Sequence, residues 1–302
     1  MRSLTLTFRV AAIALIFGLA AAPSVVAQEG FTPGSPLELM SNTRIFGSFH
    51  FAESCSYAPE KDLYVTPNAG NRGEEYGSDG YVSLINHDGT VHTLKWIGES
   101  REELTLNDPL GSDIVGGVLY VADRNVVRAF DVDSGHPLWH VEVDDALGFN
   151  DIAVAADGTI FATQTRPPER LYRIDPDGTS TVVVDGAPLS GPNGVAFDPD
   201  GNLVVVNLGV AEVHTFSPDG ELLLTEMAHD SGNDGLVILP DGTKYVSSVR
   251  FGTVGMIPAG GGDAQVIATG IPSAASMCYD PIRHRLIVPM NAWNALAFVE
   301  LD

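Results

Sequence analysis

The feature that most constrains the fold of this chain is a repeat of about 42 residues. The segment from Asn193 to Gly201, followed by an apolar run, recurs from Asn150 and again from Asp234, at spacings of 43 and 41 residues. A further 41 residues lead to Ala275, where the layout recurs with one residue inserted. A period of this length is typical of the blades of a β-propeller.

Two further copies, one beginning near Glu53 and a weaker one near Asp108, bring the number of units to six. Between them lie short alternating apolar runs, and no long stretch has helical periodicity. Asp-Gly pairs, whose glycine accepts the positive φ of a tight turn, lie at 88–89, 157–158, 177–178, 200–201, 219–220 and 241–242. We predict an all-β, six-bladed β-propeller with four strands per blade. A β-sandwich or β-helix would not repeat at this period.

The sixth unit is too short for four strands, because the chain ends two or three strands after Ala275. We expect residues 36 to 45 to add the missing outer strand. An N-terminal strand would close the ring without leaving an open edge.

The N-terminus resembles a secretory signal peptide. Arg2 and Arg9 precede an apolar run that ends at Ala22, and Val25-Val26-Ala27 offers a cleavage site. The alternative, a retained anchor, is disfavoured because the run is too short to span a bilayer as a helix. We therefore predict a signal peptide over 1–27 and a single propeller domain over 28–302, exported to a periplasm or secreted.

The formal charge of −23 becomes −25 once the two arginines of the leader are removed. Such acidity argues against nucleic acid and against anionic membranes as partners. We expect a monomer that acts on a small molecule. Cys55 and Cys278 would lie in neighbouring blades of the closed ring. Their pairing is open, and two free thiols are slightly favoured, because inner strands of adjacent blades can lie farther apart than the roughly 4.4 to 6.8 Å that a disulfide requires.

The start of each repeat places one residue where the innermost strand begins, so residues at this position converge on the central channel. In chain order they are Glu53, Asp108 or Pro109, Asn150, Asn193, Asp234, and Ala275 or Ser276. Asn and Asp are also common turn residues, which is the simpler interpretation of Asn193-Gly194 and Asp234-Gly235. That interpretation does not explain Glu53. Two carboxylates and two amides in a channel favour a divalent cation as counter-charge, and a set of oxygens without His or Cys favours Ca²⁺, Mg²⁺ or Mn²⁺ over Zn²⁺ or Cu²⁺.

The chain resembles the gluconolactonase, regucalcin and senescence-marker-protein family of six-bladed propellers, with paraoxonases as distant relatives. The resemblance is carried by Glu53 ahead of Tyr57-x-Pro59, by Phe149-Asn150-Asp151, by the segment from Gly191 to Gly201, and by Asn233-Asp234-Gly235. It implies that Glu53, Asn193 and Asp234 bind a divalent metal, often Ca²⁺ or Zn²⁺. It also implies that Asn150 contacts the substrate or completes the metal shell.

One position departs from this pattern, since Gly148 stands where sugar-lactone members have an arginine. Aldonolactones are therefore not the expected substrates. The loops between the second and third strands of the blades should overhang the channel mouth, and they carry Arg124, Arg166, Arg250 and Trp293, which we take as candidate substrate-binding residues.

Two hypotheses of different classes follow. The first is a metal-dependent hydrolase of lactones or related esters, in which Asp234 helps to deprotonate the attacking water. The second is a non-catalytic exported propeller whose metal is structural. An enzyme of other chemistry on the same scaffold, such as a lyase, stays open because fold does not fix function.

Overall fold

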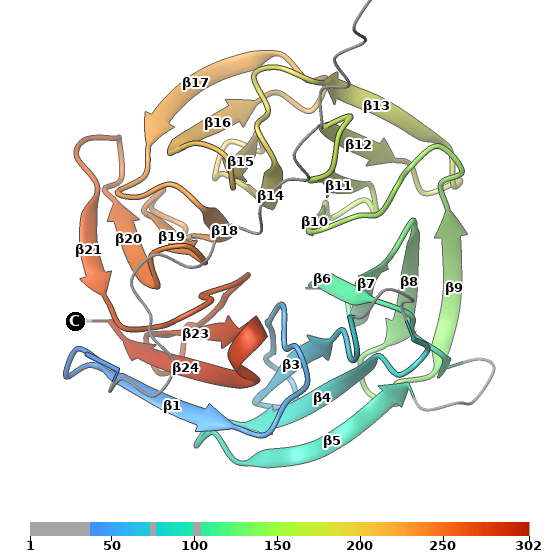
Figure 1. Cartoon of the computed structure of the whole chain (residues 1–302). Helices are drawn as coiled ribbons and strands as arrows, with labels where there is room; N and C mark the ends of the chain where they lie inside the picture. The colour runs from blue at the N-terminus through green and yellow to red at the C-terminus, as the bar shows by residue number, and fades with distance from the viewer. Residues whose placement is uncertain (1–36, 73–76, 99–103, 302) are drawn as a thin grey trace, which may run out of the picture.

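The computed structural model describes residues 37–72, 77–98 and 104–301, and it shows six four-stranded antiparallel sheets. The sheets are arranged as blades around a central channel (Figure 1). The predicted all-β six-bladed propeller is therefore confirmed. The predicted signal peptide, residues 1–27, lies outside the described residues. Within the described part of the chain, no helix is long and apolar enough to cross a membrane.

Each of the first five blades is built from four consecutive strands, from the channel outwards. Blade 1 has β2 (Ser56–Ala58), β3 (Leu63–Asn68), β4 (Tyr81–Asn86) and β5 (Val91–Gly98). Blade 2 has β6 (Pro109–Val115), β7 (Val118–Asp123), β8 (Val126–Asp131) and β9 (Pro137–Glu142). Blade 3 has β10 (Ile152–Val154), β11 (Ile160–Gln164), β12 (Arg170–Ile174) and β13 (Ser180–Asp185). Blade 4 has β14 (Pro192–Phe197), β15 (Leu203–Asn207), β16 (Glu212–Phe216) and β17 (Leu222–Met227). Blade 5 has β18 (Asn233–Ile238), β19 (Lys244–Ser248), β20 (Thr253–Ile257) and β21 (Gln265–Ala268).

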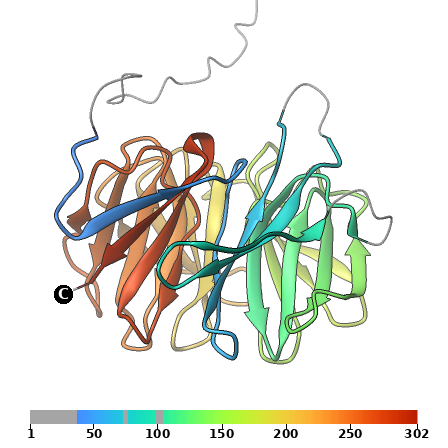
Figure 2. The same cartoon turned by 90° about the horizontal axis from the view of Figure 1, so that it is seen from below.

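Blade 6 joins the two ends of the chain. It consists of β22 (Cys278–Asp280), β23 (Arg285–Met290) and β24 (Ala295–Glu300), with β1 (Thr43–Gly47) as its outer strand. β1 pairs antiparallel with β24, and Figure 2 shows the two strands side by side at the edge of the ring. The predicted closure by an N-terminal strand is confirmed, although the strand begins at Thr43 and extends past residue 45. A short 3₁₀ turn, η2 (Asn291–Trp293), links β23 and β24.

The hydrophobic core lies between the blades. Buried apolar residues form six clusters, and each cluster draws on two neighbouring blades. The second strand of a blade, such as β15, is buried along its whole length, whereas an outer strand, such as β17, is largely exposed. Each blade therefore depends on its neighbours to bury its faces, which holds the ring together.

Glycines occupy the tight turns between consecutive strands of the blades. The six Asp-Gly pairs all lie in turns, and their glycines have φ between +83° and +92°. This is the left-handed region that glycine enters without steric cost. The sequence prediction of tight turns at these positions is confirmed, and each turn joins two consecutive strands of one blade, either the first to the second or the third to the fourth.

Candidate metal and substrate site

The predicted residues do gather where the inner strands begin. Glu53 and Asp108 immediately precede blades 1 and 2, Asn150 precedes blade 3, and Asn193 and Asp234 lie within β14 and β18. Glu53, Asn193 and Asp234 are nearly inaccessible, with exposed fractions of 3%, 1% and 4%. Asn150 is half-buried. Side chains far apart in sequence are thus brought to one end of the channel by the repeat.

Glycines after these residues allow the inner strands to approach closely. A Cβ on Gly194 would lie 2.4 Å from the backbone oxygen of Asp234, and one on Gly235 would lie 2.5 Å from that of Ala275. Neither glycine has a positive φ. The interpretation of Asn193-Gly194 and Asp234-Gly235 as turns is therefore wrong: both pairs lie inside inner strands, and glycine is needed for close approach between blades.

Hydrogen bonds between blades fix the backbone at this level. Ser276 N donates to Glu53 O over 3.1 Å and so joins blade 6 to blade 1. Gly111 N donates to Asn150 O over 2.7 Å, and Thr163 Oγ1 donates to Asn193 O over 2.6 Å. The candidate ligands are therefore mounted on a backbone that neighbouring blades hold in place, as a pre-organised site requires.

Within the described part of the chain, four buried oxygen atoms at the mouth have neither a hydrogen-bond donor nor an ion-pair partner. They belong to four different blades and are Glu53 Oε2, Asn150 Oδ1, Asn193 Oδ1 and Asp234 Oδ1. Asn193 Nδ2 donates to Asp234 Oδ2 over 3.1 Å, which orients both side chains. Buried polar atoms without partners are rare and costly. A set made of oxygens alone fits a hard cation such as Ca²⁺.

The electrostatics of the mouth point the same way. Burial, the charges of Asp234 and Asp151, and other neighbours raise the pKa of Glu53 well above its usual value. Burial and the charge of Asp151 raise the pKa of Asp234 to about 8. Carboxylates held in this way require either protons or a cation. Among the residues that the structure describes, no three His, Cys, Asp or Glu side chains are grouped to hold a metal, so a cation here would depend on the amide oxygens.

Asp151 is a site residue that the sequence analysis did not select. Its Oδ2 accepts a hydrogen bond from Ser276 Oγ over 3.0 Å, which links blade 3 to blade 6 across the channel. Burial raises the pKa of Asp151 to about 7. The sequence contained a signal for Asp151, because this residue directly follows Asn150. Only one position per blade was considered in the repeat, so Asp151 was not selected.

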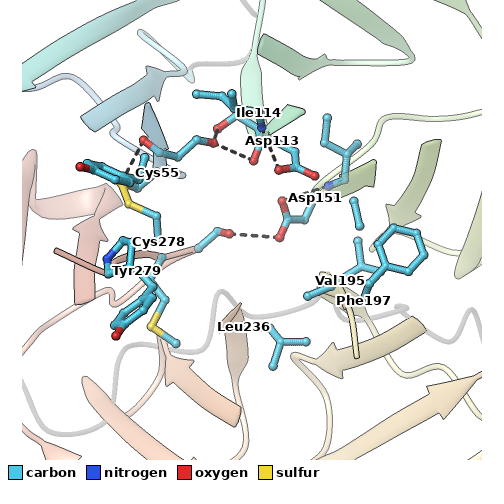
Figure 3. A pocket seen from close by; sticks show the side chains of 18 of the residues that line it. Cys55, Asp113, Ile114, Asp151, Val195, Phe197, Leu236, Cys278 and Tyr279 are labelled. Carbon is cyan, nitrogen blue, oxygen red and sulfur yellow. Dashed lines mark hydrogen bonds between the residues drawn. A yellow bond between two sulfur atoms is a disulfide. The ribbon is translucent and has the colours of Figure 1, made fainter. Parts of the chain in front are cut away.

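Asp151 and Ser276 also line a cavity of about 480 Å³. Figure 3 shows Asp113 and Asp151 on one side of it and the Cys55–Cys278 disulfide on the other. The slight preference for free thiols is therefore wrong. The two Cα atoms are 5.1 Å apart, because inner strands of adjacent blades converge near the axis and come within the range that a disulfide spans.

The candidate substrate-binding residues divide into two groups. Arg124 and Arg166, in the β7–β8 and β11–β12 loops, line a pocket of about 190 Å³ together with Asn150. Arg250 and Trp293 lie in the corresponding loops of blades 5 and 6 and do not line that pocket. Arg72 lines it as well and was missed, although it occupies the equivalent loop of blade 1.

Comparisons with known proteins agree with this architecture. Residues 85–288 match the family model described as the SMP-30/Gluconolactonase/LRE-like region. No curated protein matches the chain significantly.

Solved structures with a similar fold include enzymes of two kinds. A candidate gluconolactonase from a structural-genomics programme is 16% identical, with a TM-score of 0.65 over 88% of this chain and 93% of the other. A gluconolactonase from Xanthomonas campestris is 21% identical, with a TM-score of 0.63 over 87% and 91%. A virginiamycin B lyase from Staphylococcus aureus is 13% identical, with a TM-score of 0.58 over 86% and 99%. At these identities the likeness establishes the fold.

Proposed function

Because the chain belongs to the SMP-30/gluconolactonase/LRE-like family, we propose that it hydrolyses a lactone or a related ester with the help of a divalent cation at the channel mouth. The observation that carries the proposal is the set of four buried, donor-free oxygens from four blades. Glu53, Asn193 and Asp234 would hold the cation. The two carboxylates would balance its charge, with Ca²⁺ favoured and Mg²⁺, Mn²⁺ or Zn²⁺ as alternatives.

A bound divalent cation supplies two effects, polarisation of the carbonyl and a lower pKa of water. The chain's own residues then orient the reactants. Asn193 Nδ2 donates to Asp234 Oδ2 and so orients the carboxylate of Asp234, which would help to remove a proton from the attacking water. Asn150 is half-buried beside the mouth pocket, so its amide can position the substrate.

The same features bear on where the protein works. The Cys55–Cys278 disulfide supports export, because disulfides persist in oxidising compartments. With its charge of −23 we propose a small molecule as its partner, without nucleic acid or membrane, and a monomeric state.

Metal analysis and a lactone panel test the proposal. The purified protein should contain one divalent cation per chain, and chelation should abolish hydrolysis of its best lactone while lowering the melting temperature, since ligand binding stabilises the folded state. Re-addition of Ca²⁺ should restore both properties. Retained metal with no hydrolysis of any lactone or ester would favour the non-catalytic binding protein. Product with an elimination pattern would favour a lyase.

A further inference from the structure

The inner strands of all six blades line a cavity that the proposed reaction does not use. Its volume of about 480 Å³ lies within the range of small-molecule sites. It shares no lining residue with the pocket beside Asn150. We call it the channel cavity. Its lining reaches Pro59 and Pro281, exposed residues that follow β2 and β22, so a ligand would enter from the end of the inner strands opposite the mouth.

Two aspartates from neighbouring blades lie on one side of the channel cavity (Figure 3). Asp113 belongs to β6 and is half-buried, and Asp151 immediately precedes β10 and is 5% exposed. Their carboxylates are close enough that the charge of Asp113 raises the pKa of Asp151. Two acidic groups can therefore act on the same ligand.

Neutral donors hold both carboxylates in place. Ile114 N donates to Asp113 Oδ1 over 2.8 Å, and Val154 N donates to Asp113 Oδ2 over 2.9 Å. Ser276 Oγ donates to Asp151 Oδ2. A carboxylate has about four acceptor positions, so the two bonds to Asp113 leave capacity for a further donor.

The lining of the channel cavity provides no cationic side chain to balance these acids. None of the described residues that line it is Lys, Arg or His. Burial raises the pKa of Asp113 to about 6, because its surroundings oppose ionisation. An ionised carboxylate in such surroundings is stabilised by a positively charged ligand.

Most of the remaining lining is apolar or aromatic. Tyr57 OH donates to Asp62 Oδ1 over 3.0 Å, and Tyr279 OH lies 2.6 Å from His284 Nδ1. Neither partner lines the cavity, so the two tyrosines offer it their rings rather than their hydroxyl groups. Aromatic rings attract cations and also pack against apolar groups. Further apolar side chains of the lining are Ile114, Val195, Phe197, Leu236 and Met277.

A bare metal ion fits this lining less well than an organic cation. Ca²⁺ takes about six to eight oxygen ligands, and within the described ranges no three His, Cys, Asp or Glu side chains are grouped to hold a metal. A primary ammonium group needs only about three acceptors. Asp113, Asp151 and a serine hydroxyl can supply them, and the rings can cover the apolar body.

We propose that the channel cavity binds a small organic ammonium ion, with its charged group against Asp113 and Asp151 and its apolar body against the rings of Tyr57 and Tyr279. This site is separate from the mouth. It requires neither the cation nor the hydrolysis proposed there.

Three probes of one shape test the ligand class: phenethylamine, the neutral 2-phenylethanol and the anionic 3-phenylpropanoate. Calorimetry of the chelator-treated protein at pH 8 and physiological ionic strength, where distant surface charges are screened, should show phenethylamine binding about 10-fold to 100-fold more tightly than the alcohol, as charged hydrogen bonds provide. The anion should bind least. Asp113→Asn should abolish the preference for the amine. Asp219→Asn, the matched control, removes the charge of a carboxylate that is 93% exposed and should keep the preference.

A crystal structure of the parent with phenethylamine locates the site without any variant, and the ammonium group should lie within hydrogen-bond distance of Asp113 or Asp151. Equal affinity of the parent for the amine and the alcohol, including no measurable affinity for either, overturns the inference. An amine located elsewhere, or a preference that persists in Asp113→Asn with a native circular dichroism spectrum, does the same. A second divalent cation per chain that is lost in Asp113→Asn would assign the two carboxylates to a metal instead. No lactone enters these measurements, so their outcome is independent of the proposed function.

Discussion

The carboxylates at the two ends of the inner strands have pKa values shifted in opposite directions. At the mouth, burial and neighbouring acids raise the pKa values of Glu53 and Asp234. At the far end of blades 6 and 1, hydrogen bonds from Arg283 lower the pKa of Asp62 to about 2. Burial works to raise the pKa of Asp280, but hydrogen bonds from Tyr64 and Arg283 outweigh it and lower the pKa.

The difference lies in where the positive charge comes from. At the far end the chain supplies it: Arg283 Nη2 lies 2.6 Å from Asp62 Oδ2, and Arg283 Nη1 lies 3.0 Å from Asp280 Oδ2. At the mouth, Glu53, Asn193 and Asp234 each have one buried side-chain oxygen with no hydrogen-bond donor among the described residues. A carboxylate that is paired within the chain stabilises the closed ring, whereas a carboxylate without a partner is available to a ligand. The far end therefore serves the structure, and the mouth serves the proposed function.

Removing charge at the mouth should have the largest effect. Glu53→Gln keeps the size of the side chain but removes one of the two charges that would balance the cation. We expect weaker metal binding and a loss of turnover on the order of 10³-fold, because both carbonyl polarisation and water activation depend on the cation. Circular dichroism should stay near-native, since the packing between blades is unchanged, and excess metal should restore part of the activity.

Asn150→Ala is the companion variant. It should keep its metal and raise KM or lower kcat, because we assign Asn150 mainly to the substrate. Unchanged lactone hydrolysis by Glu53→Gln would contradict the assignment of the mouth as the reactive end.

The disulfide joins the inner strands between the two ends, and breaking it should affect stability more than chemistry. Cys55 and Cys278 are 223 residues apart in sequence. In the chain-entropy model a loop of this length contributes about 5.4 kcal/mol to the free energy of unfolding. The C55S/C278S double variant should lose stability of that order in urea titration, with lactone hydrolysis retained under native conditions. Two free thiols per denatured parent chain would contradict the bridge.

The fold could be predicted from the sequence because the repeat can be recognised from the order of the residues along the chain alone. Strand alternation, Asp-Gly turns and a constant period fixed the number of blades and the position of the mouth residues Glu53, Asn193 and Asp234. These conclusions need only the spacing along the chain, because residues at equivalent positions of successive blades lie at the same distance from the axis of a propeller and at the same level along it.

Contacts across the channel could not be predicted in the same way. The bond from Ser276 to Asp151 and the Cys55–Cys278 distance depend on how tightly the inner strands converge, and the period does not contain that information. Arg72 was missed because its loop is longer than those of the other blades and gave no alignment. Such positions follow from packing in three dimensions rather than from pattern.

Removing charge at the far end should destabilise the fold and leave the chemistry intact. Asp280 is fully buried and accepts hydrogen bonds from Tyr64 and Arg283. Because Asp62 still pairs with Arg283, we expect Asp280→Asn to cost about 3 kcal/mol, at the lower end for a broken buried pair. The melting temperature should then fall by about 6 to 12 °C.

Asp133→Asn is the matched control for this loss. Its carboxylate is 78% exposed and lies 3.7 Å from Lys61 Nζ, so it should change stability very little. Loss of metal from Asp280→Asn would show that the two ends are not independent.

The pH dependence of the metal-free protein should differ between the two ends. The pKa of Asp234 is raised to about 8 from 3.8, so between about pH 4 and pH 8 the folded state holds a proton that the unfolded state has lost. Stability from this group is therefore present at low pH and falls as the pH rises through that window. The lowered pKa of Asp62, about 2, has the opposite sign, and its contribution is lost only as the pH falls below about 4.

Cation binding should cancel the pH dependence at the mouth, because a carboxylate ligand must lose its proton to bind. Below pH 8 the apparent affinity for Ca²⁺ should rise with pH, by up to about tenfold per pH unit for each proton displaced from Asp234 and Glu53. Calorimetry in two buffers of different ionisation enthalpy measures the number of released protons directly. Asp62→Asn, at the far end, should leave the slope unchanged. A pH-independent affinity with no proton release would mean that Asp234 is already ionised without metal, and the contrast between the two ends would then rest on the unpartnered oxygens alone.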